Sequence, residues 1–206
     1  ITPQFEPFFS RGKNVILKGL LWGDIGLSKE LSEIICQCSL CGACEEFCFN
    51  AHNESIAFSQ EGWMNQVEVY EALRADLVEA GYGLDSHAVM NEAMIELLNP
   101  YGRDNKEKGE WTKRLDFKVK DASKENAEVL YFVGCTAALT PKIQEVAVAT
   151  AKILNNLGVD FSIFGEQEVC CGSVAMRTGD RKAFDEFATK NPELFEKIAV
   201  KPIITS

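Results

Sequence analysis

Four closely spaced cysteines are the residues of this sequence whose chemistry is easiest to interpret. Cys38, Cys41, Cys44 and Cys48 are separated by two, two and three residues. Thiolates at this spacing hold [4Fe–4S] clusters, because three of them on one short loop reach three corners of the cubane. The fourth starts a helix, points away and, in two-cluster proteins, binds the other cluster. The run therefore predicts that these cysteines are metal ligands and that the cofactor is a [4Fe–4S] cluster.

The residues around this run are compatible with a cluster loop. Gly42 suits a backbone that turns tightly around sulfide. Phe49 stands where such runs usually have proline, which helps the turn but is not a ligand. Zinc is the alternative metal, although its sites normally use two separated cysteine pairs. Cys36 is expected to be a buried small apolar residue beside the cluster, with a role as alternate ligand as the minor alternative.

A second group of cysteines lies far along the chain. Cys135 comes at the end of one expected strand, and Cys170 and Cys171 follow the next strand. Since the carboxyl ends of neighbouring parallel strands lie at one edge of a sheet, these cysteines should meet in space. Adjacent cysteines do not easily form a disulfide with each other, but both can be thiolate ligands of one polynuclear metal centre. Gly172 lets the backbone approach that centre closely.

Strand and helix patterns alternate in the last third of the chain, which positions the second cysteine group. This order implies right-handed crossovers and a parallel sheet. The expected strands cover residues 129–133, 159–164 and 202–205, and the expected helices cover about 140–157, 181–189 and 192–200.

The earlier part of the chain is expected to be helical. Residues 1–34 look like an irregular start with short helices, and Ser28 is a plausible N-cap of a helix that leads into the first cysteine run. Apolar residues at three- and four-residue steps predict further helices over 64–80 and 86–98. The fold class is thus α+β, with a helical ferredoxin-like region, then a Rossmann-like parallel domain. The expected bounds are 1–100 for the helical region, 101–126 for a charged linker with a short strand at 117–119, and 127–206 for the second domain.

Composition limits the class of protein. The chain has 206 residues, 46% of them hydrophobic and 25% charged, so a substantial core is feasible. A net charge of −10 argues against binding to nucleic acid or to anionic lipid. Neither an apolar run long enough to span a membrane nor a signal peptide is visible, so a cytoplasmic location is expected. Eight cysteines, clustered in a chain of this length, point to metal binding rather than to disulfides.

Both cysteine groups together resemble a known superfamily. Val133-Gly134-Cys135 and Cys170-Cys171-Gly172 are similar to the first half of a cysteine-rich CCG domain. This domain occurs in catalytic subunits of heterodisulfide reductases and in iron–sulfur subunits of glycolate and lactate oxidases. Two further segments resemble the same proteins: Ser10-Arg11-Gly12-Lys13 with Leu17 and Leu20, and Asn99-Pro100-Tyr101-Gly102.

The resemblance implies more about the clusters and about the chain. Such proteins have a first ferredoxin motif before the Ser10 segment and a Cys-x-x-Cys pair after the double cysteine. On this basis Cys48 would serve a second cluster, whose other ligands precede Ile1, and the CCG site would hold a non-cubane [4Fe–4S] cluster. The chain ends where the next cysteine is expected, so it is expected to be a fragment or an incomplete product. One hypothesis places selenocysteine at position 207, and a frameshift or an artificial chain boundary is equally compatible. An intact mass matching residues 1–206 alone would exclude selenocysteine.

Three functions follow from this interpretation. The first is an oxidoreductase subunit that passes electrons from a flavoprotein, which oxidises a 2-hydroxy acid, to a quinone or another carrier. The second is a heterodisulfide-reductase-like catalytic subunit, and the third is a structural zinc module. The expected partners are a flavoprotein and a membrane redox subunit in a hetero-oligomer, which would associate the chain with a membrane only through these partners. No phosphate-binding loop is visible, so a flavin is expected on a partner, and no catalytic residue is assigned. Glu166 and Glu168 are expected in a solvated loop, with tuning of a cluster's hydrogen bonds or potential as the minor alternative.

Overall fold

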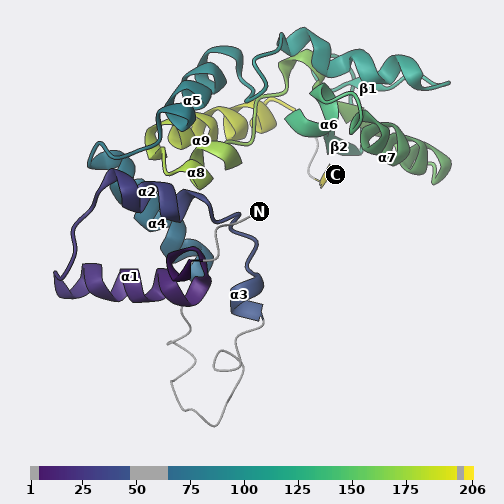
Figure 1. The fold of residues 1–206 in the computed structure, drawn as a ribbon. Coiled ribbons are helices and arrows are strands. Elements are labelled where there is room, and N and C mark those ends of the chain that lie inside the picture. The colour runs from purple at the N-terminus through teal and green to yellow at the C-terminus, as the bar shows by residue number, and fades with distance from the viewer. Residues whose placement is uncertain (1–4, 47–64, 199–201) are drawn as a thin grey trace. The chain divides into compact units, whose positions relative to one another are not determined.

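The computed structural model describes residues 5–46, 65–198 and 202–206, and these form two compact units. The first unit comprises Ile1–Ala88 with Ala175–Arg181, and the second comprises Val89–Val174 with Lys182–Ser206. The fold is α+β, with a helical part and a small parallel sheet (Figure 1). The expected division at residues 1–100, 101–126 and 127–206 stays a prediction, and the two units have different bounds.

Helices build the first unit. They are η1 (Glu6–Phe8), α1 (Ser10–Trp22), α2 (Lys29–Cys36), α3 (Ala43–Glu46), α4 (Gln66–Glu79) and the start of α5 (Asp85–Leu97). Residues 1–34 were expected to have an irregular start followed by short helices, and α1 is a continuous helix of 13 residues in this region. The N-cap prediction for α2 is confirmed, because the Ser28 hydroxyl accepts the Leu31 amide at 3.2 Å. Gly81, with φ +82°, follows α4 as the expected helix stop.

A small apolar core holds α2 against α4. Leu31 and Ile35 of α2 pack with Leu73 and Leu77 of α4, and side chains of α1 cover this cluster from outside. Burying each of these side chains stabilises the fold by roughly 1.5–3 kcal/mol. The core fixes the end of α2, and the first cysteine run starts directly after that end.

A four-stranded parallel sheet organises the second unit. Its order is β1-β3-β2-β4, and all three strand pairs are parallel. The strands are β1 (Lys120–Asp121), β2 (Val129–Phe132), β3 (Phe161–Ile163) and β4 (Ile203–Thr205). The prediction of a parallel sheet with strands near 129–133, 159–164 and 202–205 is confirmed. The short strand expected at 117–119 was misplaced, because β1 starts at Lys120.

Helices connect and cover these strands. They are η2 (Asn105–Arg114), α6 (Cys135–Leu139), α7 (Gln144–Asn156), η3 (Gly165–Gln167) and α9 (Arg181–Glu196). Helix α8 (Ser173–Thr178) belongs mostly to the first unit. Neither α6 nor α8 was predicted from the sequence. The two helices expected at 181–189 and 192–200 were wrong, since α9 is one helix that contains Pro192.

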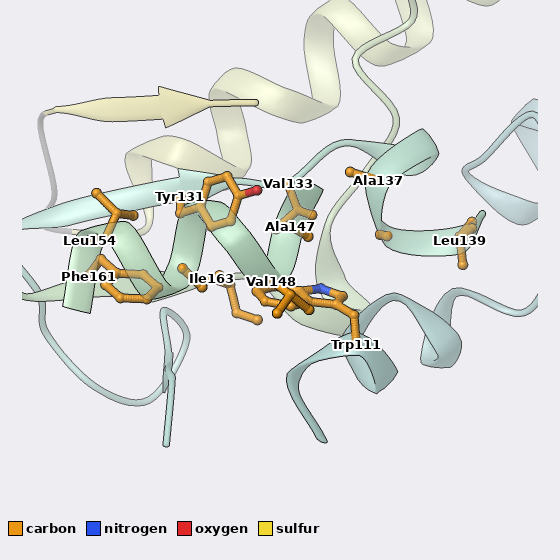
Figure 2. Packing of buried hydrophobic residues seen from close by; sticks show 12 residues of the cluster. Trp111, Tyr131, Val133, Ala137, Leu139, Ala147, Val148, Leu154, Phe161 and Ile163 are labelled. Atoms are coloured by element: carbon orange, nitrogen blue, oxygen red, sulfur yellow. The ribbon is translucent and has the colours of Figure 1, made fainter. Parts of the chain in front are cut away.

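The core of the second unit lies between the sheet and α7. Figure 2 shows Tyr131 and Phe161 from the strands together with Val148 of α7 and Trp111 of η2. Trp111 is fully buried, and its ring meets the Tyr131 ring edge-on at 6.2 Å between centroids. The segment expected to be a linker therefore supplies a central core residue, because the edge-to-face packing and the buried area of an indole anchor it to the sheet.

Candidate metal centres

The first cysteine run forms the loop between α2 and α3. Cys38 and Cys41 lie in the loop, and Cys44 lies in the short helix α3. Two residues with positive φ turn the backbone, namely Leu40 at +55° and Gly42 at +74°. Leu40 is buried, so its apolar contacts offset the strain of a left-handed leucine. The loop thus curls back and brings its thiols close together.

Electrostatic coupling indicates that the three thiols share a small volume. The amide of Ala43 and the hydroxyl of Ser39 donate to the Cys41 sulfur and lower the pKa of this exposed thiol. Burial, followed by the negative charge of Cys38, raises the pKa of Cys44, and Cys41 adds to this effect. Neighbouring negative charges oppose ionisation of Cys44, and a cation beside it would have the opposite effect. This donor set is chemically suited to a thiolate-bound iron–sulfur cluster.

Arg74 of α4 holds this loop to its surroundings. The side chain is only 5% exposed. Its guanidinium donates to the carbonyl oxygens of Cys38 at 2.5 Å and Ile35 at 2.9 Å, and also to that of Arg177 at 2.6 Å. One buried cation therefore fixes the end of α2, the cysteine loop and the last turn of α8.

Tyr70 gives a titration that reports on this site. Its hydroxyl donates to Asn14 Oδ1 at 3.1 Å, and the side chain is almost completely buried. Burial, with a smaller contribution from Cys44 and Cys38, raises the pKa of Tyr70 to about 12. We expect one of the four tyrosines of the cluster-free chain to ionise only near pH 12, in an ultraviolet titration of the phenolate band.

The variant Tyr70→Phe should lack this late step. Because the folded-state pKa of Tyr70 lies above its ordinary value near 10, its contribution to stability is complete below pH 10 and is lost as the pH rises toward 12. A late step that persists in the Tyr70→Phe chain would assign it to another tyrosine. If all four tyrosines ionised near pH 10, the result would contradict a pKa of Tyr70 raised by burial.

The N-terminal region has two further cysteines, Cys48 and Cys36. Cys48 lies outside the described residues. Cys36 is the last residue of α2, and its sulfur is 3.9 Å from the Ser32 hydroxyl oxygen. Cys36 is only partly buried, so it is less enclosed than expected.

The second cysteine group meets where the sequence places it, beyond β2 and β3. Cys135 is the first residue of α6 after β2, and Cys170 and Cys171 follow η3 after β3. Strands β2 and β3 are hydrogen-bonded neighbours in parallel orientation. The side chains of Cys135 and Cys170 are hydrogen-bonded to each other, and Cys170 also bonds to Cys171. The structure therefore brings all three thiols together, as predicted from the topology.

These three thiols have different proton affinities. The hydrogen bond from Cys170 lowers the pKa of Cys135, against the effect of burial, and Lys108 adds to this lowering. The bond to Cys135 raises the pKa of Cys170 to about 11, and the bond to Cys170 raises the pKa of Cys171. Cys135 is thus the thiol best prepared to be a thiolate.

Backbone hydrogen bonds hold the double cysteine in place. The Cys170 amide donates to the Leu98 carbonyl at 3.1 Å, and its carbonyl accepts Asn191 Nδ2 at 2.9 Å. Both polar groups of this buried residue are therefore satisfied.

Glu168 and Lys108 are buried charges near the second cysteine group; Lys108 was not assigned to the site from the sequence, and Glu168 was given only a minor tuning role. Glu168 was expected in a solvated loop, but it is only 1% exposed. Its carboxylate accepts the amides of Val133 and Gly134, each at 2.9 Å. Lys108 is equally buried and donates to the Glu168 carbonyl. Glu168 is buried because two backbone donors and an ammonium group compensate its carboxylate, which would otherwise stay in water.

Gly172 is required by its surroundings. Its φ is +82°, and a Cβ at this position would lie 2.9 Å from Cβ of Phe187 and 3.1 Å from the Phe184 ring. We expect Gly172→Ala to lower the free energy of unfolding by about 2–4 kcal/mol, because backbone strain adds to overpacking. Urea denaturation measures the change.

Gly158 offers a matched control for this substitution. It also has a positive φ, +71°, but nothing lies within 4 Å of the position that a Cβ would take. Gly158→Ala should therefore cost only the strain, about 1–2 kcal/mol. Equal losses for the two variants would mean that contact with Phe187 is unimportant.

The donor chemistry of both cysteine groups fits iron–sulfur clusters. Within residues 5–46, 65–198 and 202–206, no three side chains of His, Cys, Asp or Glu are arranged to hold a single metal ion. A polynuclear cluster has its ligands on different irons, so its thiols do not need to converge on one point. Gly134 and Gly172, beside the second group, both have a positive φ and turn the backbone next to the thiols.

Comparisons with known proteins agree with this chemistry. Residues 129–206 match the CCG cysteine-rich domain family. A component of the dihydromethanophenazine:CoB–CoM heterodisulfide reductase of Methanosarcina mazei is 36% identical over 85% of this chain and 39% of its own length. The probable iron–sulfur-binding oxidoreductase FadF of Bacillus subtilis is 32% identical over 90% of this chain and 25% of its own. The EtfAB:quinone oxidoreductase of Syntrophomonas wolfei is 27% identical over 93% of this chain and 25% of its own length.

These relatives are longer than the chain, which spans less than half of each of them. No solved structure matches significantly. No helix among the described residues combines the length and apolarity needed to cross a membrane. The cysteine motifs, the parallel sheet and the relatives agree: residues 129–206 match the CCG cysteine-rich domain, and the chain is similar to iron–sulfur oxidoreductases and their subunits.

Proposed function

We propose that this chain is an electron-transfer subunit with two cluster sites. The observation that carries the proposal is the gathering of thiols at two separate places, each in a frame of backbone hydrogen bonds. The proposed ligands are Cys38, Cys41, Cys44 and Cys48 in the ferredoxin-type run, and Cys135, Cys170 and Cys171 in the CCG domain.

The chain's own residues would position these clusters. Arg74 fixes the Cys38 carbonyl, and the Ala43 amide supplies a donor to the Cys41 sulfur. Glu168 fixes the turn before Cys135 through the amides of Val133 and Gly134. When bound, the clusters supply one-electron storage and transfer.

The proposed donor is a flavoprotein dehydrogenase that oxidises a 2-hydroxy acid, and the proposed acceptor is a quinone or another carrier. A relative named as an EtfAB:quinone oxidoreductase supports an acceptor of this class. In this arrangement the chain works in a hetero-oligomer, and any membrane association comes from a partner.

A disulfide reductase is the second candidate. Cys171 is exposed while Cys135 and Cys170 are buried, so the site has one accessible side. The relatives named as components of heterodisulfide reductases support this candidate. The overall reaction would be disulfide plus two electrons and two protons giving two thiols, with the two electrons coming one at a time from the proposed flavoprotein donor.

Metal analysis tests the proposal first. Iron, acid-labile sulfide and zinc would be measured per chain on anaerobically purified protein. About four or more irons with equal sulfide support the electron-transfer subunit. Stoichiometric zinc without sulfide would replace it with a structural zinc module.

A second experiment separates the two candidates. The iron-loaded, reduced chain would be mixed anaerobically with a soluble quinone or with the CoB–CoM heterodisulfide, and reoxidation would be followed by absorbance. Fast reoxidation by quinone alone supports electron transfer. Reoxidation by the heterodisulfide with release of thiols supports the reductase.

A further inference from the structure

Lys108 is an unusual residue of the second cysteine site. It lies in η2 and is only 1% exposed, although lysines are almost never fully buried unless they are paired. Its ammonium group donates to the Glu168 carbonyl at 2.5 Å, and its positive charge contributes to the lowered pKa of Cys135. A buried positive charge therefore lies on the main chain two residues before Cys170.

The opposite charge nearby is used differently. Both carboxylate oxygens of Glu168 accept backbone amides, from Val133 and Gly134, at the turn between β2 and α6. The carboxylate is thus bound to the main chain directly before Cys135, while the ammonium group is bound to the main chain shortly before Cys170. The Glu168 carbonyl also accepts Asn105 Nδ2 at 3.1 Å, which fixes the acceptor of Lys108 from a second side.

We propose that Lys108 is a positioning residue that favours the reduced state of the iron–sulfur centre held by Cys135, Cys170 and Cys171. The inference rests on the proposed function, because it requires a cluster at this site. Reduction adds one negative charge to the centre, and a fixed positive charge in a buried environment stabilises that charge strongly. Charges and hydrogen bonds at the ligand sulfurs are known determinants of cluster potential.

A purely structural role is the competing explanation. Lys108 also ties η2 to the segment before the double cysteine, so its removal would reduce stability in either case. Only the electrostatic role predicts a change in the midpoint potential of a cluster that is still bound. The potential is therefore the measurement that distinguishes the two roles.

The experiment is a redox titration, followed by electron paramagnetic resonance, of the full chain loaded with iron and sulfide. The variants Lys108→Met and Lys108→Gln remove the charge, and Lys108→Arg retains it. Lys106→Met is the matched control, because Lys106 is an exposed lysine of the same helix. We expect both neutral variants to lower the equilibrium constant of one-electron reduction at least tenfold, about 59 mV toward negative potential. Lys108→Arg and Lys106→Met should stay near the original value.

Each outcome has a defined meaning. If the unsubstituted chain assembles no cluster at this site, the proposed function fails. If the neutral variants bind the same iron and sulfide but keep the original potential, the inference about Lys108 is overturned.

A second variant covers the case in which neither neutral variant retains its cluster. Glu168→Gln removes the negative charge of Glu168, the buried residue whose backbone carbonyl accepts Lys108. This variant should shift the midpoint potential of the cluster in the positive direction. An unchanged potential in this variant would contradict an electrostatic role for the buried charges.

Discussion

Replacing Cys41 by serine is expected to remove the ferredoxin-type cluster and about four irons per chain. Cys41 lies between Leu40 and Gly42, which both have a positive φ, and its sulfur already accepts a hydrogen bond from the Ala43 amide. A serine hydroxyl has a far higher pKa than a thiol and is a poor ligand for iron in such clusters. Iron and sulfide analysis together with the visible absorption spectrum measures the loss.

Cys36→Ala is the matched control for this variant. Cys36 ends α2, outside the cysteine loop, and its sulfur contacts the Ser32 hydroxyl. The iron content of the control should equal that of the unsubstituted chain. An equal loss of iron in both variants would make Cys36 a ligand and would invalidate the assignment by spacing. Retained iron in Cys41→Ser would exclude Cys41 itself.

The sequence was most informative where local chemistry alone determines structure. The cap at Ser28 and the glycine stop after α4 depend on neighbouring residues, and both occur as expected. The meeting of Cys135 with the double cysteine followed from the rule that parallel strands present their carboxyl ends at one edge.

Pro192 shows why one helix could not be predicted. A proline inside a helix removes a hydrogen bond and usually breaks it. Here the fully buried Phe187 and the stacking of Phe195 on Phe164, at 6.0 Å between centroids, hold both halves of α9 in place. Asn191 donates to the Phe187 carbonyl at 3.0 Å. Tertiary packing thus overcomes the proline penalty.

Lys108 and Glu168 could not be assigned from sequence for a different reason. Both lie in stretches rich in charged residues, where a solvent-exposed position is the usual outcome. Their burial depends on η2 packing against η3 and on the anchoring of Trp111 in the core, which are contacts between distant segments. Only the fold shows that the two charges compensate each other beside Cys135.

Arg74→Met is expected to lower the free energy of unfolding by about 3 kcal/mol. The substitution leaves the carbonyls of Ile35, Cys38 and Arg177 without their charged donor. Hydrogen bonds from charged groups contribute roughly 1.5–3 kcal/mol each. Because the methionine variant no longer buries a charge, part of this loss is offset. Arg74→Lys should recover only part of the loss, because one ammonium group does not reproduce the planar geometry of the guanidinium.

Urea denaturation of the cluster-free chain measures this effect, and Arg11→Met supplies the control. Arg11 is an exposed arginine paired with Glu6 at 2.6 Å, so its loss should change stability by less than about 0.5 kcal/mol. Stability of Arg74→Met equal to that of the control would mean that water replaces the guanidinium at all three carbonyls. A large loss that is specific to Arg74 would instead show that the cysteine loop is held in shape before any cluster binds. Such preorganisation would reduce the entropy lost when the thiols bind a cluster.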